Sequence, residues 1–251
     1  MHMNPFPAIF AILHIVTHVH ATHPAGRYPT RTIAGVSVID TPLVRAAHDL
    51  ARDHGDVHIY RHVMRSWLFG AIMIGRNETL SKTIDLEVHA VSVLLHDLGW
   101  DRTSNSPFVS PDRRFEVDGA IAARSFIRNH RDGARWEERR VQLVWDAIAL
   151  HTEPRIAWFK EPDVAAVQKG VGMDFEGPGF GVTSEEYNAV VGEFPKQGFR
   201  NSLNQTMIWL CQTKPRSTYD NFIQPWGDRY VQGYRADGNE QVFDTIFLNL
   251  P

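Results

Sequence analysis

The pair His96-Asp97 is the feature of the sequence whose residue types point most directly to chemistry. It ends the apolar run of residues 91–95 and is followed by Leu98 and Gly99. An imidazole and a carboxylate are costly to bury in such surroundings unless a partner binds both, and a divalent metal ion is such a partner. The sequence therefore predicts a metalloprotein.

Further ligands must be nitrogen or oxygen donors, because Cys211 is the single cysteine and a cysteine-based zinc site cannot be built. A mononuclear site draws its ligands from several helices, since one helix presents too few groups to one point. Taken singly, His62 is more typical of a partly exposed or hydrogen-bonded histidine than of a ligand, and Asp174 is more typical of a residue at a helix end. Together with the doublet they form a candidate ligand set, namely His62, His96, Asp97 and Asp174. Such a set suits zinc, our first choice, and also ferrous iron or manganese.

The elements that must position these side chains are helices. From Thr41 onward the apolar residues recur every three or four positions, and no strand-like alternation extends over five or more positions. We predict an all-α fold, a single-domain helical bundle with an irregular C-terminal tail. The expected helices span about 42–55, 57–75, 83–95, 115–129, 136–151, 162–173 and 201–214, with another that begins after Thr183. Residues 101–114 are rich in turn formers and are expected to form a loop over the site.

Three segments are expected along the chain: an N-terminal arm or signal segment (1–38), the helical metal-binding domain (39–214) and a tail packing on it (215–251). The apolar stretch of residues 6–16 is shorter than the ~20 residues of a membrane span. A small-residue cleavage motif at Ala21 favours a signal peptide, whereas the lack of a preceding Lys or Arg disfavours one. We expect a cytoplasmic protein, or a secreted or periplasmic one if residues 1–21 are a signal.

Charge and composition limit the partners. The chain has 26 basic and 29 acidic residues and no basic run that would track a phosphate backbone, so we expect no nucleic acid and no membrane as partner. A small molecule is the expected substrate. Aromatic residues of the tail indicate either a homodimer contact or packing of the tail on its own bundle: Tyr219, Phe222, Trp226 and Tyr230.

Five blocks of the sequence resemble the HD-domain superfamily of all-helical metal-dependent hydrolases and lyases, and within it the cyanamide-hydratase-like branch. These blocks are residues 60–65 (YRHVMR), 95–99 (LHDLG), 114–120 (RFEVDGA), 147–152 (AIALHT) and 172–174 (GMD). The turn at 194–199 (FPKQGF) is also similar, and the resemblance covers roughly residues 39–234. It implies an HD-type bundle with His62, His96, Asp97 and Asp174 as ligands, and hydration or hydrolysis of a small carbon-nitrogen substrate such as a nitrile or cyanamide.

Two departures from the family pattern bear on the substrate. Trp100 stands where many phosphoesterases of the superfamily have a lysine, which removes one phosphate anchor. Arg61 and Val63 flank the first ligand, where relatives of cyanamide hydratase have asparagine and serine, so Arg61 or Arg65 could meet a larger or more anionic substrate. The alternatives are therefore an HD-type phosphohydrolase acting on a nucleotide or small phosphate ester, and a catalytically silent member that binds a ligand or stores metal.

The remaining site residues are expected to move protons or to contact the substrate. A metal ion lowers the pKa of bound water, and protonation of a nitrile-type nitrogen then needs a nearby acid. Glu116 and His151 are the candidates, either for direct proton transfer or for orienting the ligand histidines by hydrogen bonds. Arg61, Arg65 and Trp100 are expected to line the entrance, under the 101–114 loop.

Overall fold

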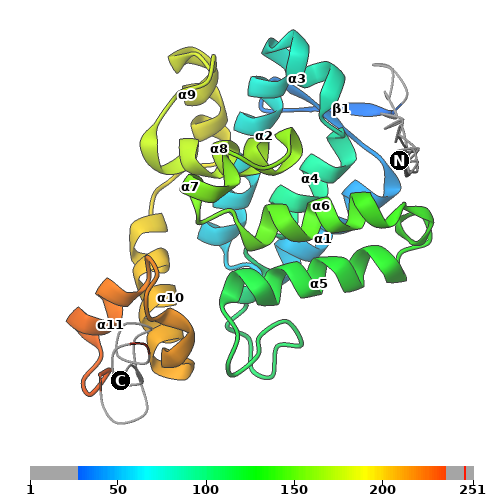
Figure 1. Ribbon diagram of the computed structural model, residues 1–251. Helices are drawn as coiled ribbons and strands as arrows, with labels where there is room; N and C mark the ends of the chain where they lie inside the picture. The colour runs from blue at the N-terminus through cyan, green and yellow to red at the C-terminus, as the bar shows by residue number, and fades with distance from the viewer. Residues whose placement is uncertain (1–27, 236–245, 247–251) are drawn as a thin grey trace, which may run out of the picture.

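The computed structural model describes residues 28–235 and residue 246, and within them the fold is helical (Figure 1). This confirms the all-α prediction, with one small exception. Strands β1 (Thr30–Ile33) and β2 (Val36–Ile39) pair antiparallel, with Thr30 opposite Ile39. The turn residues Ala34 and Gly35 both have positive φ, which suits a tight hairpin. The strands are four residues each, too short for the alternation that would have predicted them.

Short polar side chains start the principal helices. Thr41 accepts a hydrogen bond from the backbone of Val44 and so caps α1 (Pro42–His54), which has proline at its first position. Asp56 caps α2 (Val57–Arg76) in the same way, and Asp85 caps α4 (Leu86–Leu95). Thr183 forms a capping box with Glu186 at the start of α9 (Ser184–Glu193). The predicted starts of α1, α2 and α9 are thereby confirmed, whereas α4 begins at Leu86, about three residues after its predicted start.

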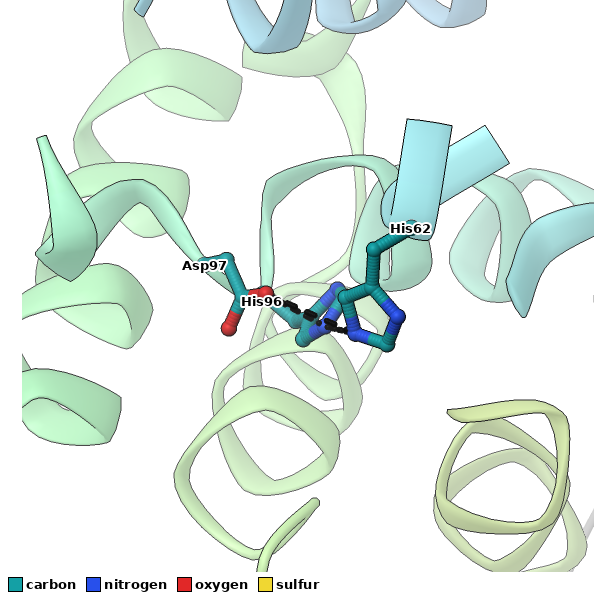
Figure 2. A group of neighbouring side chains, drawn as sticks. All are labelled: His62, His96 and Asp97. Atoms are coloured by element: carbon teal, nitrogen blue, oxygen red, sulfur yellow. Dashed lines mark hydrogen bonds and ion pairs between the residues drawn. The ribbon is translucent and has the colours of Figure 1, made fainter. Parts of the chain in front are cut away.

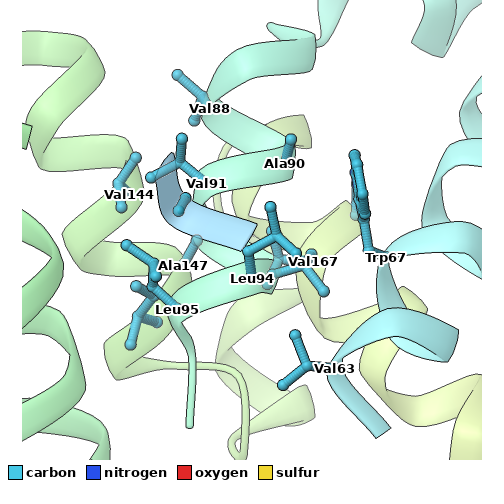
Figure 3. Close-up of a cluster of buried hydrophobic side chains, with 14 of the residues drawn as sticks. Val63, Trp67, Val88, Ala90, Val91, Leu94, Leu95, Val144, Ala147 and Val167 are labelled. Carbon is cyan, nitrogen blue, oxygen red and sulfur yellow. The ribbon is translucent and has the colours of Figure 1, made fainter. Parts of the chain in front are cut away.

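Helix α4 lies at the centre of the bundle, and nine of its ten residues are buried. It packs against α1, α2, α6 (Glu138–Ala149) and α8 (Pro162–Glu176). Figure 3 shows side chains of α4, such as Val91 and Leu94, interdigitating with Val63 and Trp67 of α2, Val144 of α6 and others. Burial on all sides explains why this segment reads as an apolar run, and it fixes the position of the doublet at the C-terminal end of α4.

Helices α2 and α8 make the most extensive helix pair, and glycine permits their close approach. A Cβ atom on Gly170 of α8 would lie 2.8 Å from the carbonyl oxygen of Ser66 and 3.3 Å from Cα of Gly70, both on α2. The close contact sets the distance between the helix that carries His62 and the helix that carries Asp174.

The remaining helices cover this centre. Helix α5 (Phe115–Asn129) packs on α6, and the sequence 101–114 before it is irregular apart from turns and bends, as predicted. Short helices that were not predicted are α3 (Glu78–Thr83), α7 (Pro154–Ala157) and three 3-10 turns at Leu98–Trp100, Gly133–Arg135 and Pro215–Thr218.

The C-terminal segment is more regular than expected. Helix α10 (Phe199–Thr213) begins two residues before its predicted start, and the expected irregular tail contains α11 (Gln224–Tyr230). These helices lie beside the main body (Figure 1) and share a second apolar core with Trp100 and Phe115. The tail aromatics Tyr219 and Trp226 pack in this core, which favours packing on the protein's own bundle over the dimer contact for these two residues.

No helix in residues 28–235 is both long and apolar enough for a membrane span. The predicted signal segment of residues 1–21 lies outside the described residues.

Candidate metal centre

Three of the four predicted ligands meet in the interior. His62 lies in the second turn of α2, and His96 and Asp97 directly follow α4. Nε2 of His96 lies 3.3 Å from Nε2 of His62 and 3.1 Å from Oδ2 of Asp97, and Nε2 of His62 lies 3.6 Å from that same oxygen (Figure 2). A tetrahedral ion with bonds of about 2.1 Å separates its ligand atoms by roughly 3.4 Å. The His–Asp cluster formed by these three residues is buried and can hold a metal ion.

The second ring nitrogen of each histidine is hydrogen-bonded in a way that fixes its tautomer. Nδ1 of His96 donates to the carbonyl oxygen of Val93 at 2.7 Å, and Nδ1 of His62 donates to Oδ2 of Asp174 at 2.6 Å. Both acceptors are oxygens without a proton to give, so the neutral rings carry their proton on Nδ1. Their Nε2 lone pairs therefore face each other and Asp97, which is favourable once a cation lies between them.

The surroundings of Asp97 also indicate that a cation binds here. Its side chain is 2% exposed, and neither of its oxygens accepts a hydrogen bond from another described residue. A buried carboxylate without donors is unstable unless it is paired with positive charge. The donor set of two imidazoles and one carboxylate therefore fits a divalent ion such as zinc.

The electrostatics of the pair agree with this requirement. Burial lowers the pKa of His96, but the Asp97 carboxylate, the hydrogen bond to Val93 and the more distant Asp174 together raise it overall. For Asp97 the effect of burial has the opposite sign and raises the pKa. The interactions with His96 and His62 outweigh it, so the pKa of Asp97 is lowered overall. Asp97 is thus held as an anion, and the site favours positive charge beside it.

Asp174 lies on the far side of His62 from this cluster. The sequence placed it among four ligands, whereas the structure has its carboxylate hydrogen-bonded to Nδ1 of His62 and in a bidentate ion pair with Arg65, at 2.7 Å for both oxygens. Hydrogen bonds from His62 and Arg65 overcome the effect of burial and hold the pKa of Asp174 well below its usual range. In this arrangement Asp174 orients a ligand histidine.

Arg65 also differs from its expected place at the entrance. Its side chain is fully buried, and besides Asp174 it donates to the carbonyl oxygen of Phe194 at 3.0 Å. Lys196 approaches Asp174 from the same turn, with Nζ 3.1 Å from Oδ1. Asp174 therefore pairs with two cations. Both also connect it to the 194–199 turn, because Lys196 belongs to this turn and Arg65 donates to Phe194.

Trp100 and Arg61 have contrasting surroundings. Trp100 is buried, with its ring stacked 6.5 Å from the ring of His62 and tilted against Phe115. Its indole Nε1 has no hydrogen-bond partner among the described residues. Arg61 is partly exposed and precedes His62 in α2, and adjacent residues of a helix do not share a face.

His151 lies next to the cluster, whereas Glu116 has other partners. Nε2 of His151 is 3.7 Å from Oδ1 of Asp97, while its Nδ1 donates to the carbonyl oxygen of Ile148 at 2.6 Å. Burial and the neighbouring His96 lower the pKa of His151 to about 4, so a neutral ring presents its lone pair to Asp97. Glu116 is buried but contacts Arg114 and Thr152. His151 is therefore the better placed of the two predicted proton carriers.

Two aromatic rings pack against His62, one from α8 and one from α10. The ring of Phe199 stacks on His62 with centroids 4.9 Å apart, and Phe175 lies 5.1 Å from the same ring. Neither was predicted as a site residue. The similarity of residues 194–199 to a family turn was a signal for Phe199, whereas nothing in the sequence singled out Phe175.

The chain matches no protein-family model and no curated protein. The resemblance to the HD-domain superfamily therefore stays a prediction.

Proposed function

We propose that this protein is a metal-dependent hydratase or hydrolase of the HD-domain type, which adds water to a small carbon-nitrogen substrate of the nitrile or cyanamide kind. The observation that carries the proposal is the convergence of two Nε2 lone pairs and an unpaired carboxylate at separations of 3.1 to 3.6 Å. A divalent ion bound there would lower the pKa of water and polarise an electrophile. Zinc is the expected ion, with ferrous iron or manganese as alternatives.

The surrounding residues support a small, uncharged substrate. Three cations near the site are already engaged in ion pairs with protein carboxylates. Arg65 and Lys196 both pair with Asp174, and Arg114 pairs with Glu116. A phosphate ester would need free positive charge beside the metal, whereas a neutral substrate tolerates the aromatic walls formed by Trp100 and Phe199. These contacts favour the carbon-nitrogen substrate over the phosphohydrolase alternative.

His151 is the residue expected to move protons in this reaction. Its neutral Nε2 can accept a proton from water in the site and return it to the substrate nitrogen, while Nδ1 keeps its hydrogen bond to Ile148. Water adds across the carbon-nitrogen bond, so the proton lost by the water is the one gained by nitrogen, and the reaction needs no external acid.

Metal content and product release test the proposal together. Elemental analysis of protein purified without added metal should find about one divalent ion per chain, and the ion should be lost in Asp97→Ala. The loaded protein should then convert cyanamide or small nitriles and leave nucleoside monophosphates intact. Phosphate release without turnover of the nitrogen substrates would support the phosphohydrolase instead, and bound metal without any turnover would support a silent binding protein.

A further inference from the structure

A small cavity connects the metal centre to the end of α1. It has a volume of about 10 Å³ and is lined mainly by apolar side chains of α1, α2 and α4, with His54 and Asp97 as its ionisable wall residues. The side chain of Asp97 is 2% exposed and that of His54 is 29% exposed, so the cavity runs from a buried ligand to a residue that solvent reaches. This volume is about the space that one water molecule requires.

Two of the residues that line the cavity have polar atoms without a hydrogen-bond partner among the described residues. The two carboxylate oxygens of Asp97 accept no hydrogen bond from a described residue. His54 uses Nδ1 in a 3.0 Å hydrogen bond with Oδ2 of Asp101, and Nε2 makes no hydrogen bond within the described residues. A cavity that holds one water molecule and is lined by a hydrogen-bond acceptor and an imidazole nitrogen contains the groups that a proton relay needs.

The imidazole of His54 is held in place on two sides. The side chain of Asp101 is fully buried and also accepts the backbone N–H of Thr103 at 3.0 Å. Phe108 meets the histidine ring edge to face, with centroids 4.7 Å apart. The hydrogen bond to Asp101 keeps a proton on Nδ1, so Nε2 is the nitrogen that can accept one.

Other charged groups around His54 are largely paired with one another. On its own helix, Arg52 contacts Asp49 and Asp53. Across the turn that follows α1, Arg102 pairs with Asp56 at 2.9 Å. Two anions remain near the cavity: Asp101, which bonds to His54, and Asp97, which lines the cavity with His54. A proton that moves inward from His54 therefore passes from the neighbourhood of one carboxylate to that of the other.

We propose that this cavity holds one water molecule and that His54 exchanges protons through it between solvent and the metal centre. The proposal rests on the proposed function, because it assigns a proton route to that same site. In the outward direction a water beside Asp97 loses a proton to the cavity water, which passes one of its own to Nε2 of His54. One O–H bond breaks for each bond to hydrogen that forms, and the resulting imidazolium releases its proton to solvent.

Nuclear relaxation of the manganese-loaded protein tests this route without measuring turnover. Oxygen-17 relaxation of solvent water reports whole water molecules that exchange at the ion, whereas proton relaxation also reports protons that leave alone. We expect His54→Gln to lower the proton relaxation enhancement several-fold, with bound manganese and the oxygen-17 signal unchanged. His48→Gln is the matched control, since His48 lies on the same helix but bonds to Tyr60 and does not line the cavity.

The outcomes separate this proposal from the function on which it rests. If the wild-type protein binds manganese and His54→Gln leaves both relaxation signals at their wild-type values, the relay is wrong and the metal centre stands. A parallel fall of both signals would show that His54 admits water and does not carry protons. If the wild-type protein binds neither manganese nor zinc, the metal centre itself is contradicted, and the relay with it.

Discussion

Nδ1 of His62 donates a 2.6 Å hydrogen bond to Asp174, while Nε2 of the same ring faces Asp97 at 3.6 Å. The imidazole is thus held between two buried carboxylates with different roles. Asp174 is already neutralised by Arg65 and Lys196, whereas Asp97 has no such partner. The positive charge missing from the site is therefore located at Asp97, which is where a bound ion would contribute it.

Replacing Arg65 by methionine should destabilise the fold by about 3–5 kcal/mol, because it leaves the Asp174 carboxylate buried with one cation instead of two. Urea unfolding followed by circular dichroism measures the change. Arg76→Met is the control on the same helix, since Arg76 pairs with Glu186 at the surface and should cost no more than about 1 kcal/mol. Equal losses in the two variants would contradict a structural role for the buried pair.

Replacing His151 by glutamine should reduce turnover by about 100-fold and leave the bound metal in place, because Nε2 of His151 is assigned to proton transfer. Steady-state rates and elemental analysis of the same preparation measure both effects. His130→Gln, after the end of α5, should leave both unchanged. If His151→Gln instead loses its metal, the residue is a ligand and its assigned role is wrong.

The sequence predicted most of this bundle because the bundle is built from local signals. Capping residues such as Asp56 and Thr183 mark helix starts in the chain itself, and the apolar run before His96 reports burial on all sides. The short hairpin and α11 escaped prediction, because strands of four residues show too little alternation and α11 is stabilised by a core shared with distant residues.

Three of the four predicted ligands lie together in the structure, whereas other predicted site residues lie elsewhere than expected. His62, His96 and Asp97 were identified because imidazoles and carboxylates in apolar surroundings require a partner. The orientation of a ring is not encoded in spacing, so the sequence could not show that Asp174 meets the opposite nitrogen of His62. The sequence also could not show that Arg65 forms an ion pair with Asp174 and is therefore not available to a substrate.

Replacing Gly99 by alanine should destabilise the protein by about 1–3 kcal/mol, because a Cβ atom there would lie 2.2 Å from the carbonyl oxygen of Phe115. Gly99, two residues after Asp97, allows the start of α5 to approach the ligand residues closely. Gly75→Ala is the control: beyond the local backbone of its own helix, no described atom lies within 4 Å of the added Cβ. Alanine also suits a helix better, so stability should rise slightly. Thermal unfolding of both variants checks the contrast, and a neutral Gly99→Ala would contradict the close contact.

His89 gives the last prediction, which concerns the dependence of stability on pH. Its side chain is buried in α4, its Nε2 has no partner among the described residues, and burial lowers its pKa from 6.5 to about 4. Between these values the unfolded chain binds a proton that the folded chain rejects, so the free energy of unfolding decreases as pH falls from 6.5 to 4. The full effect is about 3 kcal/mol.

The variant His89→Leu should remove that part of the acid sensitivity, since leucine binds no proton in either state. Urea unfolding of both proteins at several pH values between 7 and 4 measures the slope, which should be shallower in the variant by up to one bound proton. The slope is the relevant quantity, because leucine also changes the packing against Gly70 and so shifts the stability at every pH. Parallel curves for the two proteins would show that His89 is protonated equally in the folded and unfolded states.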